Sequence, residues 1–260
     1  MSADLQVHRD GAVVTVTFDR PARHNAMTFE MYEGLHAACD TVDADRDVRV
    51  LVLRGAGGRA FVSGTDITTF SDFRDGTDGV AYERRIGRVL NRLEDVRVPT
   101  VAAIEGYCVG GGLAIAAVCD LRVAARSGRF GVPIARTLGN CLSMNTLSIL
   151  VGQLGPSRAM DLVLRARLLD AAEAHAAGFV AEICDDGALD GALAGVIETL
   201  LHHAPLTMWA AKVAAARLRR ANLPDGDDFV TRVFGSEDFR RAVAAFASGG
   251  ARNAPPWTGS

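Results

Sequence analysis

The feature of the sequence that most constrains the fold is a glycine triplet at residues 110–112, which lies between two apolar segments. Val101 to Ile104 has the character of a short buried strand, and Leu113 to Val118 that of a buried helix. A strand that turns through glycines into a helix exposes backbone N–H groups at the positive end of the helix dipole. Such a turn can hold an anion, or a carbonyl oxygen that becomes one during a reaction. Glycines also allow close packing of a helix on a sheet, and the spacing alone favours this packing role.

The triplet does not match the common nucleotide-binding motifs. A dinucleotide turn that starts at Gly110 needs a third glycine at position 115, where the chain has Ile115. A P-loop needs a lysine directly after a glycine, but the only lysine, Lys212, follows Ala211. The sequence contains neither H-E-x-x-H nor G-x-S-x-G, which argues against the metalloprotease and serine hydrolase classes that use them.

Charge and composition exclude further classes. The formal net charge is −3 without a basic block, which argues against nucleic acid as a partner. The five cysteines form no C-x-x-C pair and the six histidines have no metal-ligand spacing, so we expect no disulfide framework and no metal site. The N-terminus lacks a basic and then apolar signal, and the most apolar stretch, 101–119, contains Glu105 and four glycines. We therefore expect a cytoplasmic protein without a membrane partner.

Periodicity predicts an α/β fold in which strands and helices alternate and are followed by a purely helical region. Thr28 is expected to cap a helix in which Met31, Leu35, Ala38 and Val42 share one face. Strands are expected at 13–18, 48–53, 101–104 and 121–124, and further helices at 82–93, 113–118, 146–153, 157–164, 171–177, 189–201, 206–218 and 237–247.

A second glycine turn and several other segments together carry a family resemblance. The second turn is Phe61-Val-Ser-Gly-Thr-Asp-Ile67. With it, in order along the chain, occur Arg20-Pro-Ala-Arg-His-Asn-Ala-Met27, the stretch from Pro99 through the triplet to Cys119-Asp120, Phe130-Gly131, Ala171–Ala174 leading to Gly178, and Ser236–Phe239 followed by Phe246. In these segments the sequence resembles the crotonase (enoyl-CoA hydratase/isomerase) superfamily over nearly the whole chain.

The resemblance implies a fold, a substrate class and an assembly. The expected fold is an α/β spiral of ββα turns, with a core at 1–195 and a C-terminal helical region at 196–260 that mediates oligomerisation. The substrate is expected to be an acyl-CoA thioester, and no cofactor is implied beyond the CoA of the substrate. A homotrimer or a dimer of trimers is expected.

The resemblance also implies which residues bind the thioester. Its oxygen is expected between the backbone N–H groups of Thr65 and Gly111. CoA contacts are expected from Arg23, Ala26, Ser63, Gly64, Thr65, Asp66, Ile67, Tyr107 and Gly110. Arg23 is expected to pair with a CoA phosphate. The family often uses a C-terminal lysine for the same purpose, and here Arg252 is the nearest substitute.

The sequence departs from the family pattern at both hydratase glutamates. One of these positions is Ala114, two residues after the triplet, and the other is Ile134, after Pro133. Addition of water to a conjugated thioester requires one group to take a proton and another to give one, and neither alanine nor isoleucine can do so. Ordinary enoyl-CoA hydration is therefore not expected.

The polar stretch 133–143 offers replacements, each with a simpler alternative. Arg136 can hold a carboxylate or sulfonate of the acyl group, or form a surface or subunit salt bridge. Asn140 can position water, or cap a helix that starts near Leu142, which the pattern slightly favours. Cys141 lies near the nucleophile position of related dehalogenases, although a buried cysteine is more commonly inert.

Two residues of the expected helix at 82–93 are weaker candidates. Tyr82 and Glu83 can reach the acyl group as a donor or base, but a solvated helix face is the favoured interpretation. Asp66 and Asp120 are expected to anchor the structure rather than to take part in chemistry.

Two classes of function remain open. The first is an active crotonase-type enzyme without the two glutamates, including a hydrolase or dehalogenase type. The second is a CoA-ester-binding protein that has lost turnover. The polar run from Arg136 to Ser143 favours an enzyme, because a binding protein has no need of a polar pocket wall.

Overall fold

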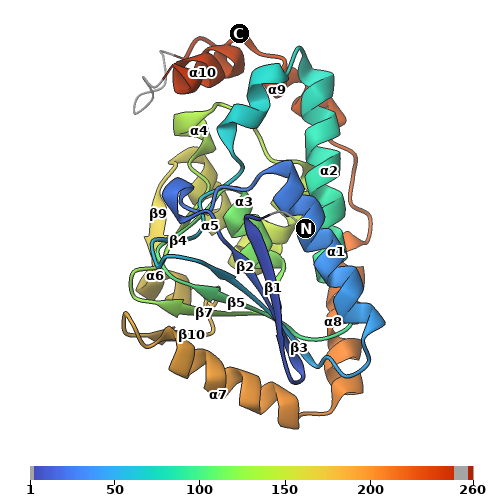
Figure 1. Cartoon of the computed structure of the whole chain (residues 1–260). Helices are drawn as coiled ribbons and strands as arrows, with labels where there is room; N and C mark the ends of the chain where they lie inside the picture. The colour runs from blue at the N-terminus through green and yellow to red at the C-terminus, as the bar shows by residue number, and fades with distance from the viewer. Residues whose placement is uncertain (1–2, 249–256, 260) are drawn as a thin grey trace.

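The computed structural model describes residues 3–248 and 257–259, which fold around two β-sheets (Figure 1). The larger sheet has the order β1-β2-β3-β5-β7-β10, in which only the β1–β2 pair is antiparallel. Its strands are β1 (Leu5–Asp10), β2 (Val13–Phe18), β3 (Val50–Gly55), β5 (Thr100–Ile104), β7 (Leu121–Ala125) and β10 (Glu182–Cys184). The smaller sheet has the order β4-β6-β8-β9, with strands β4 (Ala60–Val62), β6 (Tyr107–Val109), β8 (Arg129–Gly131) and β9 (Leu168–Asp170).

The expected spiral of ββα turns is confirmed. Strands β3 and β4, β5 and β6, and β7 and β8 follow one another in pairs, and each pair contributes one strand to each sheet before a helix returns the chain. The helices are η1 (Pro21–Arg23), α1 (Phe29–Ala44), η2 (Ile67–Asp72), α2 (Gly76–Glu94), α3 (Gly111–Val118), α4 (Ile134–Thr137), α5 (Met144–Leu164), α6 (Ala171–Ala176), α7 (Leu189–His202), α8 (Pro205–Arg220), α9 (Asp227–Phe234) and α10 (Glu237–Ala247).

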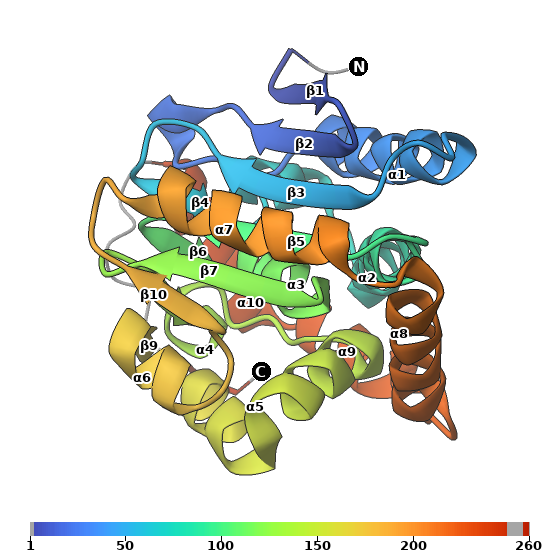
Figure 2. The same ribbon diagram turned by 90° about the horizontal axis from the view of Figure 1, so that it is seen from below.

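Both faces of the larger sheet are buried, which explains its nearly continuous apolar strands. On one face, Val50, Val52 and Val101 pack under α7, which lies over the strands in Figure 2. On the other face, Leu51 and Leu53 join the main core beneath α1, α2 and α3. The sheet is therefore a rigid support for the turns at its strand ends.

The helix predictions hold where capping and periodicity agree. Thr28 is the N-cap of α1, and its hydroxyl accepts a hydrogen bond from the Met31 N–H at 3.3 Å. Helix α2 begins six residues earlier than expected, because Asp75 and Asp78 form a capping box there. The two helices expected at 146–164 are both part of α5, which is kinked at Gly155, where φ is +73°.

The sequence analysis missed the whole smaller sheet, as well as β1, β10 and α9. Each strand of the smaller sheet has three residues, too few to show an alternating pattern. The expected domain boundary after residue 195 falls within α7, a continuous helix whose Leu193 and Leu200 both pack on the larger sheet. No helix among residues 3–248 and 257–259 is long and apolar enough to cross a membrane.

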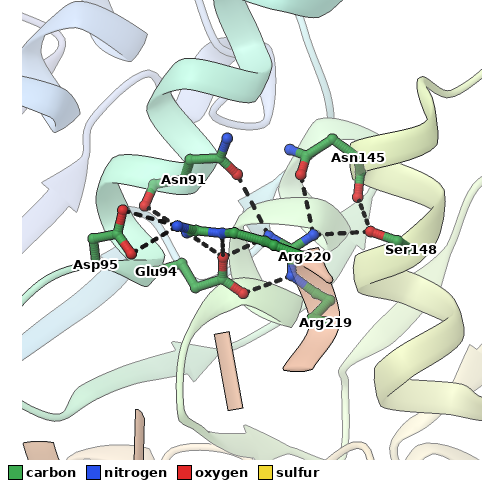
Figure 3. A network of polar contacts seen from close by, with 7 residues as sticks. All are labelled: Asn91, Glu94, Asp95, Asn145, Ser148, Arg219 and Arg220. Atoms are coloured by element: carbon green, nitrogen blue, oxygen red, sulfur yellow. Dashed lines mark hydrogen bonds and ion pairs between the residues drawn. The ribbon is translucent and has the colours of Figure 1, made fainter. Parts of the chain in front are cut away.

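Two groups of ionic contacts attach α8 to the core. Lys212 pairs with Asp120, which also accepts hydrogen bonds from the N–H and hydroxyl of Thr100 at 2.7 and 2.8 Å. At the C-terminal end of α8, Glu94 of α2 accepts from both Arg219 and Arg220 (Figure 3). Arg219 also reaches α5, where it donates to the Ser148 hydroxyl at 2.8 Å. Asn91, Asp95 and Asn145 complete the network in the figure.

We predict that Glu94→Ala lowers the free energy of unfolding by about 2–4 kcal/mol, because it leaves two partly buried guanidinium groups without their shared carboxylate. The Glu94 side chain is only 15% exposed. Glu33→Ala is the matched control. Glu33 pairs with Arg85, but its side chain is 50% exposed, so this substitution should lower the free energy of unfolding by less than about 1 kcal/mol. Urea denaturation of both variants measures the difference, and equal costs would contradict the prediction.

Candidate active site

The two glycine turns meet at a cavity of about 570 Å³. One wall is formed by the turn from β4 into η2 and by the turn from β6 into α3. The other walls come from α2, from α4 with the loop that follows it, and from Ala242, Ala245 and Phe246 of α10. Segments that are far apart in the sequence therefore enclose one space of a size typical for small-molecule sites.

Thr65 and Gly111 lie next to each other at this cavity. A Cβ atom added to Gly111 would lie 3.7 Å from the backbone nitrogen of Thr65, and one added to Gly64 would lie 4.0 Å from the backbone nitrogen of Gly111. Among the described residues neither N–H donates a hydrogen bond, and Gly111 is the first residue of α3, where the N–H has no partner within the helix. Two unbonded N–H groups therefore line the same cavity wall.

The backbone around this pair depends on glycine and on local hydrogen bonds. Gly64 and Gly110 have φ values of +110° and +55°, in the left-handed region that glycine tolerates. Met27 fixes the first turn, because its N–H donates to the Gly64 carbonyl at 2.8 Å and its carbonyl accepts from the Asp66 N–H at 2.9 Å. The Thr65 amide is thus held in place from both sides.

A chain of three hydroxyl groups runs beside the two amides. The Thr65 hydroxyl lies 2.9 Å from the Tyr32 hydroxyl and 2.7 Å from the Tyr82 hydroxyl. Burial raises the pKa of both tyrosines, so both remain neutral hydroxyl groups. Tyr32 was not among the sequence candidates, and its hydroxyl comes so close that a Cβ at Gly111 would lie 2.5 Å from it.

Glu83 is a buried carboxylate in the same cavity, which corrects the solvated face expected for it and for Tyr82. Both residues are buried, with 7% and 8% of their surface exposed, because α2 packs against α1, α3 and α9. The Ser143 N–H donates to Glu83 Oε2 at 2.9 Å. Burial raises the pKa of Glu83 and outweighs the opposing effect of the hydrogen bond from Ser143. No cation in the described chain forms an ion pair with Glu83.

Both positions of the expected hydratase glutamates line the cavity without a carboxylate. Ala114 lies on α3 and Ile134 at the start of α4, and both are buried. Among the described residues that line the cavity, Glu83 is the only carboxylate and Arg136 the only cation. Groups of three or more His, Cys, Asp or Glu side chains that could hold a metal ion do not occur in the part of the chain that the structure describes.

The three candidates from the polar stretch lie in different environments. Arg136 is exposed at the cavity and forms no ion pair with any described residue. Asn140 also lines the cavity, and its buried Oδ1 accepts no hydrogen bond. The cap role considered for Asn140 is wrong, because the N-cap of α5 is Ser143, whose hydroxyl accepts from the Thr146 N–H.

Cys141 does not line the cavity. Burial raises the pKa of its thiol to about 12, and the charge of Glu83 adds to this effect. A thiol with this pKa is almost entirely protonated at neutral pH, so its environment opposes the nucleophile role and fits the inert alternative.

The expected CoA-binding residues fall into two groups. Ser63, Gly64, Thr65, Ile67 and Gly110 line the cavity. The others lie beside it: Arg23 and Tyr107 are exposed, whereas Ala26 lies in the loop between η1 and α1 and Asp66 in the turn from β4 into η2.

Asp66 is an anchor, as expected, because it accepts from Arg20 at 3.0 Å and from the Thr68 N–H at 3.2 Å, where η2 begins. Arg20 also donates to the Ala26 carbonyl at 2.6 Å and thereby connects two loops. Arg252 lies outside the described residues.

A spiral of ββα turns, with a cavity between two glycine turns at one end of its strands, defines the crotonase class of proteins. The chain belongs to the enoyl-CoA hydratase/isomerase family, whose model matches residues 8–258.

Individual relatives extend over nearly the whole chain. A probable enoyl-CoA hydratase of Mycobacterium bovis is 31% identical over 258 residues, which cover 98% of this chain and 97% of the relative. A Delta(3,5)-Delta(2,4)-dienoyl-CoA isomerase of Arabidopsis thaliana is 27% identical over 257 residues, covering 93% of this chain and 92% of the relative. The crystal structure of an enoyl-CoA hydratase/carnithine racemase from Magnetospirillum magneticum superposes with a TM-score of 0.81 at 34% identity, covering 100% and 97% of the two chains. Hydratases and isomerases therefore both occur among the relatives.

We predict that Glu83→Gln is more stable than the wild type at pH 8, and that the advantage shrinks toward pH 5. The folded-state pKa of Glu83 is raised, so the native protein binds more protons than the unfolded chain between the ordinary and the raised pKa, and its stability falls as the pH rises through that range. Glutamine keeps the acceptor for the Ser143 N–H but cannot ionise. Thermal melts across this pH range provide the measurement. The exposed Glu33→Gln is the control, and a constant difference for Glu83→Gln would contradict the prediction.

Proposed function

We propose that this member of the family stabilises an enolate or oxyanion of an acyl-CoA thioester with the backbone N–H groups of Thr65 and Gly111. The observation that carries the proposal is the pair of unbonded amides at one cavity wall. Negative charge accumulates on the thioester oxygen during enolate formation or nucleophilic attack. Amides fixed at ~3 Å from that oxygen each lower the barrier by about 3 kcal/mol in comparable sites.

The residues around the amides favour an enzyme over a non-catalytic CoA-ester-binding protein. Glu83 is a carboxylate buried without a cation, an arrangement that costs stability and has no use in simple binding. Asn140, which also lines the cavity, likewise has a buried side-chain oxygen that accepts no hydrogen bond. The hydrolase or dehalogenase alternative needs Cys141 as a nucleophile. The raised pKa keeps this thiol protonated, which argues against that alternative.

We further propose a homotrimer or a dimer of trimers that uses no cofactor other than the CoA of its substrate and acts in the cytoplasm. Large apolar side chains on α8 support assembly, since Leu206 and Leu218 are 77% and 79% exposed and Trp209 is 45% exposed. Exposed apolar surface of this kind is typical of subunit interfaces.

We predict that Gly111→Pro loses activity at least 100-fold, because proline has no N–H to donate to the oxyanion. Thr65→Ala should retain most activity, since its amide remains. Turnover of the acyl-CoA substrate found by screening thioesters for loss of the substrate peak provides the measurement.

Gly111→Ala is the matched control for the proline variant. It introduces the same Cβ contact with the Tyr32 hydroxyl but keeps the N–H, so it isolates the steric part of the effect. Circular dichroism checks that each variant folds. Full activity of a folded Gly111→Pro protein would show that this amide does not bind the oxyanion.

We predict that the wild type hydrates crotonyl-CoA at best several orders of magnitude more slowly than a competent hydratase, since acid–base groups contribute roughly 10²–10⁴-fold each. Ala114→Glu combined with Ile134→Glu should raise the hydration rate, whereas neither single variant should recover much. Both groups are needed because they act on one water molecule. The new carboxylates will also cost stability, because both positions are buried.

Loss of the enoyl-thioester absorbance, followed with the wild type and all three variants, provides the measurement. Wild-type turnover comparable to that of a hydratase would mean that other residues of this cavity activate water.

A further inference from the structure

We infer that Glu83 is the catalytic base and acid of this site, and that it moves a proton between two carbons of the bound acyl chain. The inference rests on the proposed function, because the acidity of a carbon beside the thioester depends on the oxyanion site formed by Thr65 and Gly111. It assigns a catalytic role to a residue of α2, away from both positions where the family pattern expects carboxylates.

The position of Glu83 in the cavity is the first argument. It shares the cavity with both amides, and no other described residue of its lining carries a carboxylate. The same lining includes the apolar side chains of Ile86, Ala114, Ile134 and Leu142. An acyl chain that enters this space with its carbonyl oxygen at the amides would therefore meet one group able to accept a proton.

The hydrogen bonding of Glu83 is the second argument. The Ser143 N–H binds Oε2, which fixes the orientation of the carboxylate. Oε1 accepts no hydrogen bond from a described residue. It is not one of the fully buried polar atoms without a partner, so part of its surface is accessible. One oxygen is therefore held by the protein and the other remains open.

Tyr82 contacts the residue that provides one of the two amides. It is adjacent to Glu83 on α2, and its hydroxyl lies 2.7 Å from the Thr65 hydroxyl. The same turn of helix thus carries the carboxylate and touches the turn that carries the Thr65 amide.

The charges around Glu83 suit a group that must both take and return a proton. Tyr32, Tyr82 and Cys141 interact with it electrostatically, and all three are neutral at pH 7 because their pKa values are raised. Arg136 is the cation of the cavity, and on the outer side of α2 Arg84 pairs with Asp227. The raised pKa of Glu83 brings it closer to neutral pH, where a single carboxylate is effective in both directions.

A single carboxylate defines the reaction class. Hydration needs two groups on one water, whereas a proton shift along a carbon chain needs one. In a 3-enoyl thioester, Glu83 takes a proton from C2, and the C2–H electron pair forms the enolate whose oxygen the amides hold. Glu83 then gives the same proton to C4. The former C3–C4 π electrons form the new C4–H bond, the C1–C2 π electrons of the enolate become the C2–C3 double bond, and the oxygen regains its carbonyl double bond. No water, oxidant or other reactant is consumed.

Deuterium uptake by an acyl-CoA in D₂O tests the proton-transfer step. We expect the wild type to exchange the C2 protons of butyryl-CoA, followed by mass spectrometry, and to convert 3-hexenoyl-CoA into its conjugated isomer, followed by absorbance. Glu83→Gln should lower both rates at least 100-fold. Calorimetric affinity for butyryl-CoA should change by less than about 3-fold, because glutamine preserves size and the hydrogen bond from Ser143.

Two further variants keep the test decisive. Glu83→Asp, which retains a carboxylate but withdraws it by one methylene group, should be slower than the wild type and keep an exchange rate that rises with pH to a plateau. That pH dependence should disappear in Glu83→Gln. Glu33→Gln, at an exposed glutamate of α1, should match the wild type.

The outcomes separate this inference from the proposed function. Exchange by Glu83→Gln at more than a third of the wild-type rate overturns the role of Glu83 and leaves the oxyanion site standing. A wild type that binds butyryl-CoA but exchanges no proton also overturns it. A wild type that binds no acyl-CoA refutes the proposed function itself, and the inference with it.

Discussion

The site depends on a close approach of backbone to backbone. Helix α3 begins so near β4 that a Cβ added to Gly112 would lie 2.1 Å from the carbonyl oxygen of Val62, a distance that no side chain allows. This contact places the turn after β4 beside the N-terminus of α3, and with it Thr65 beside Gly111. The positive end of the helix dipole then faces the same space. Close packing and anion binding were alternatives in the sequence, but in the structure the same glycines serve the first and permit the second.

The cavity combines turns that stabilise the fold with a buried carboxylate that destabilises it. Its amide donors belong to well-packed turns, in which the N–H groups of Met27, Asp66 and Gly110 are hydrogen-bonded. Its carboxylate, by contrast, is buried against apolar side chains with one N–H as a partner. The cost of ionising Glu83 is borne by the rest of the fold, including the Glu94 network that joins α2 to α5 and α8. Sites that need reactive groups commonly retain such local instability.

The resemblance to a known family predicted the spiral, and it also implied the two amides that the structure places at one cavity wall. The sequence pattern did not predict the smaller sheet, whose three-residue strands such as β6 carry no period. It also misassigned Glu83, although this residue precedes Ile86 by three positions and Leu90 by seven and so lies on the apolar stripe of α2. The charge of Glu83 suggested a solvent-exposed position. In the structure α9, a helix that the sequence pattern did not reveal, covers that part of α2. The expected cap role of Asn140 was wrong because the sequence offers two residues that can cap a helix. Ser143 is an equally good N-cap, and it directly precedes α5.

Helix α10 lines the cavity with Ala242, Ala245 and Phe246. Different parts of the chain therefore form the thioester end and the outer wall of the cavity. The donors proposed for the thioester are main-chain atoms in the first half of the chain, so they persist through most side-chain replacements. The wall contributed by α10 consists of small and aromatic side chains near the end of the chain, on a helix that the spiral does not need for its own closure. Variation there can reshape the space for the acyl group while the electrostatics of the thioester oxygen stay unchanged. Within such an architecture, substrate range and reaction chemistry can diverge independently.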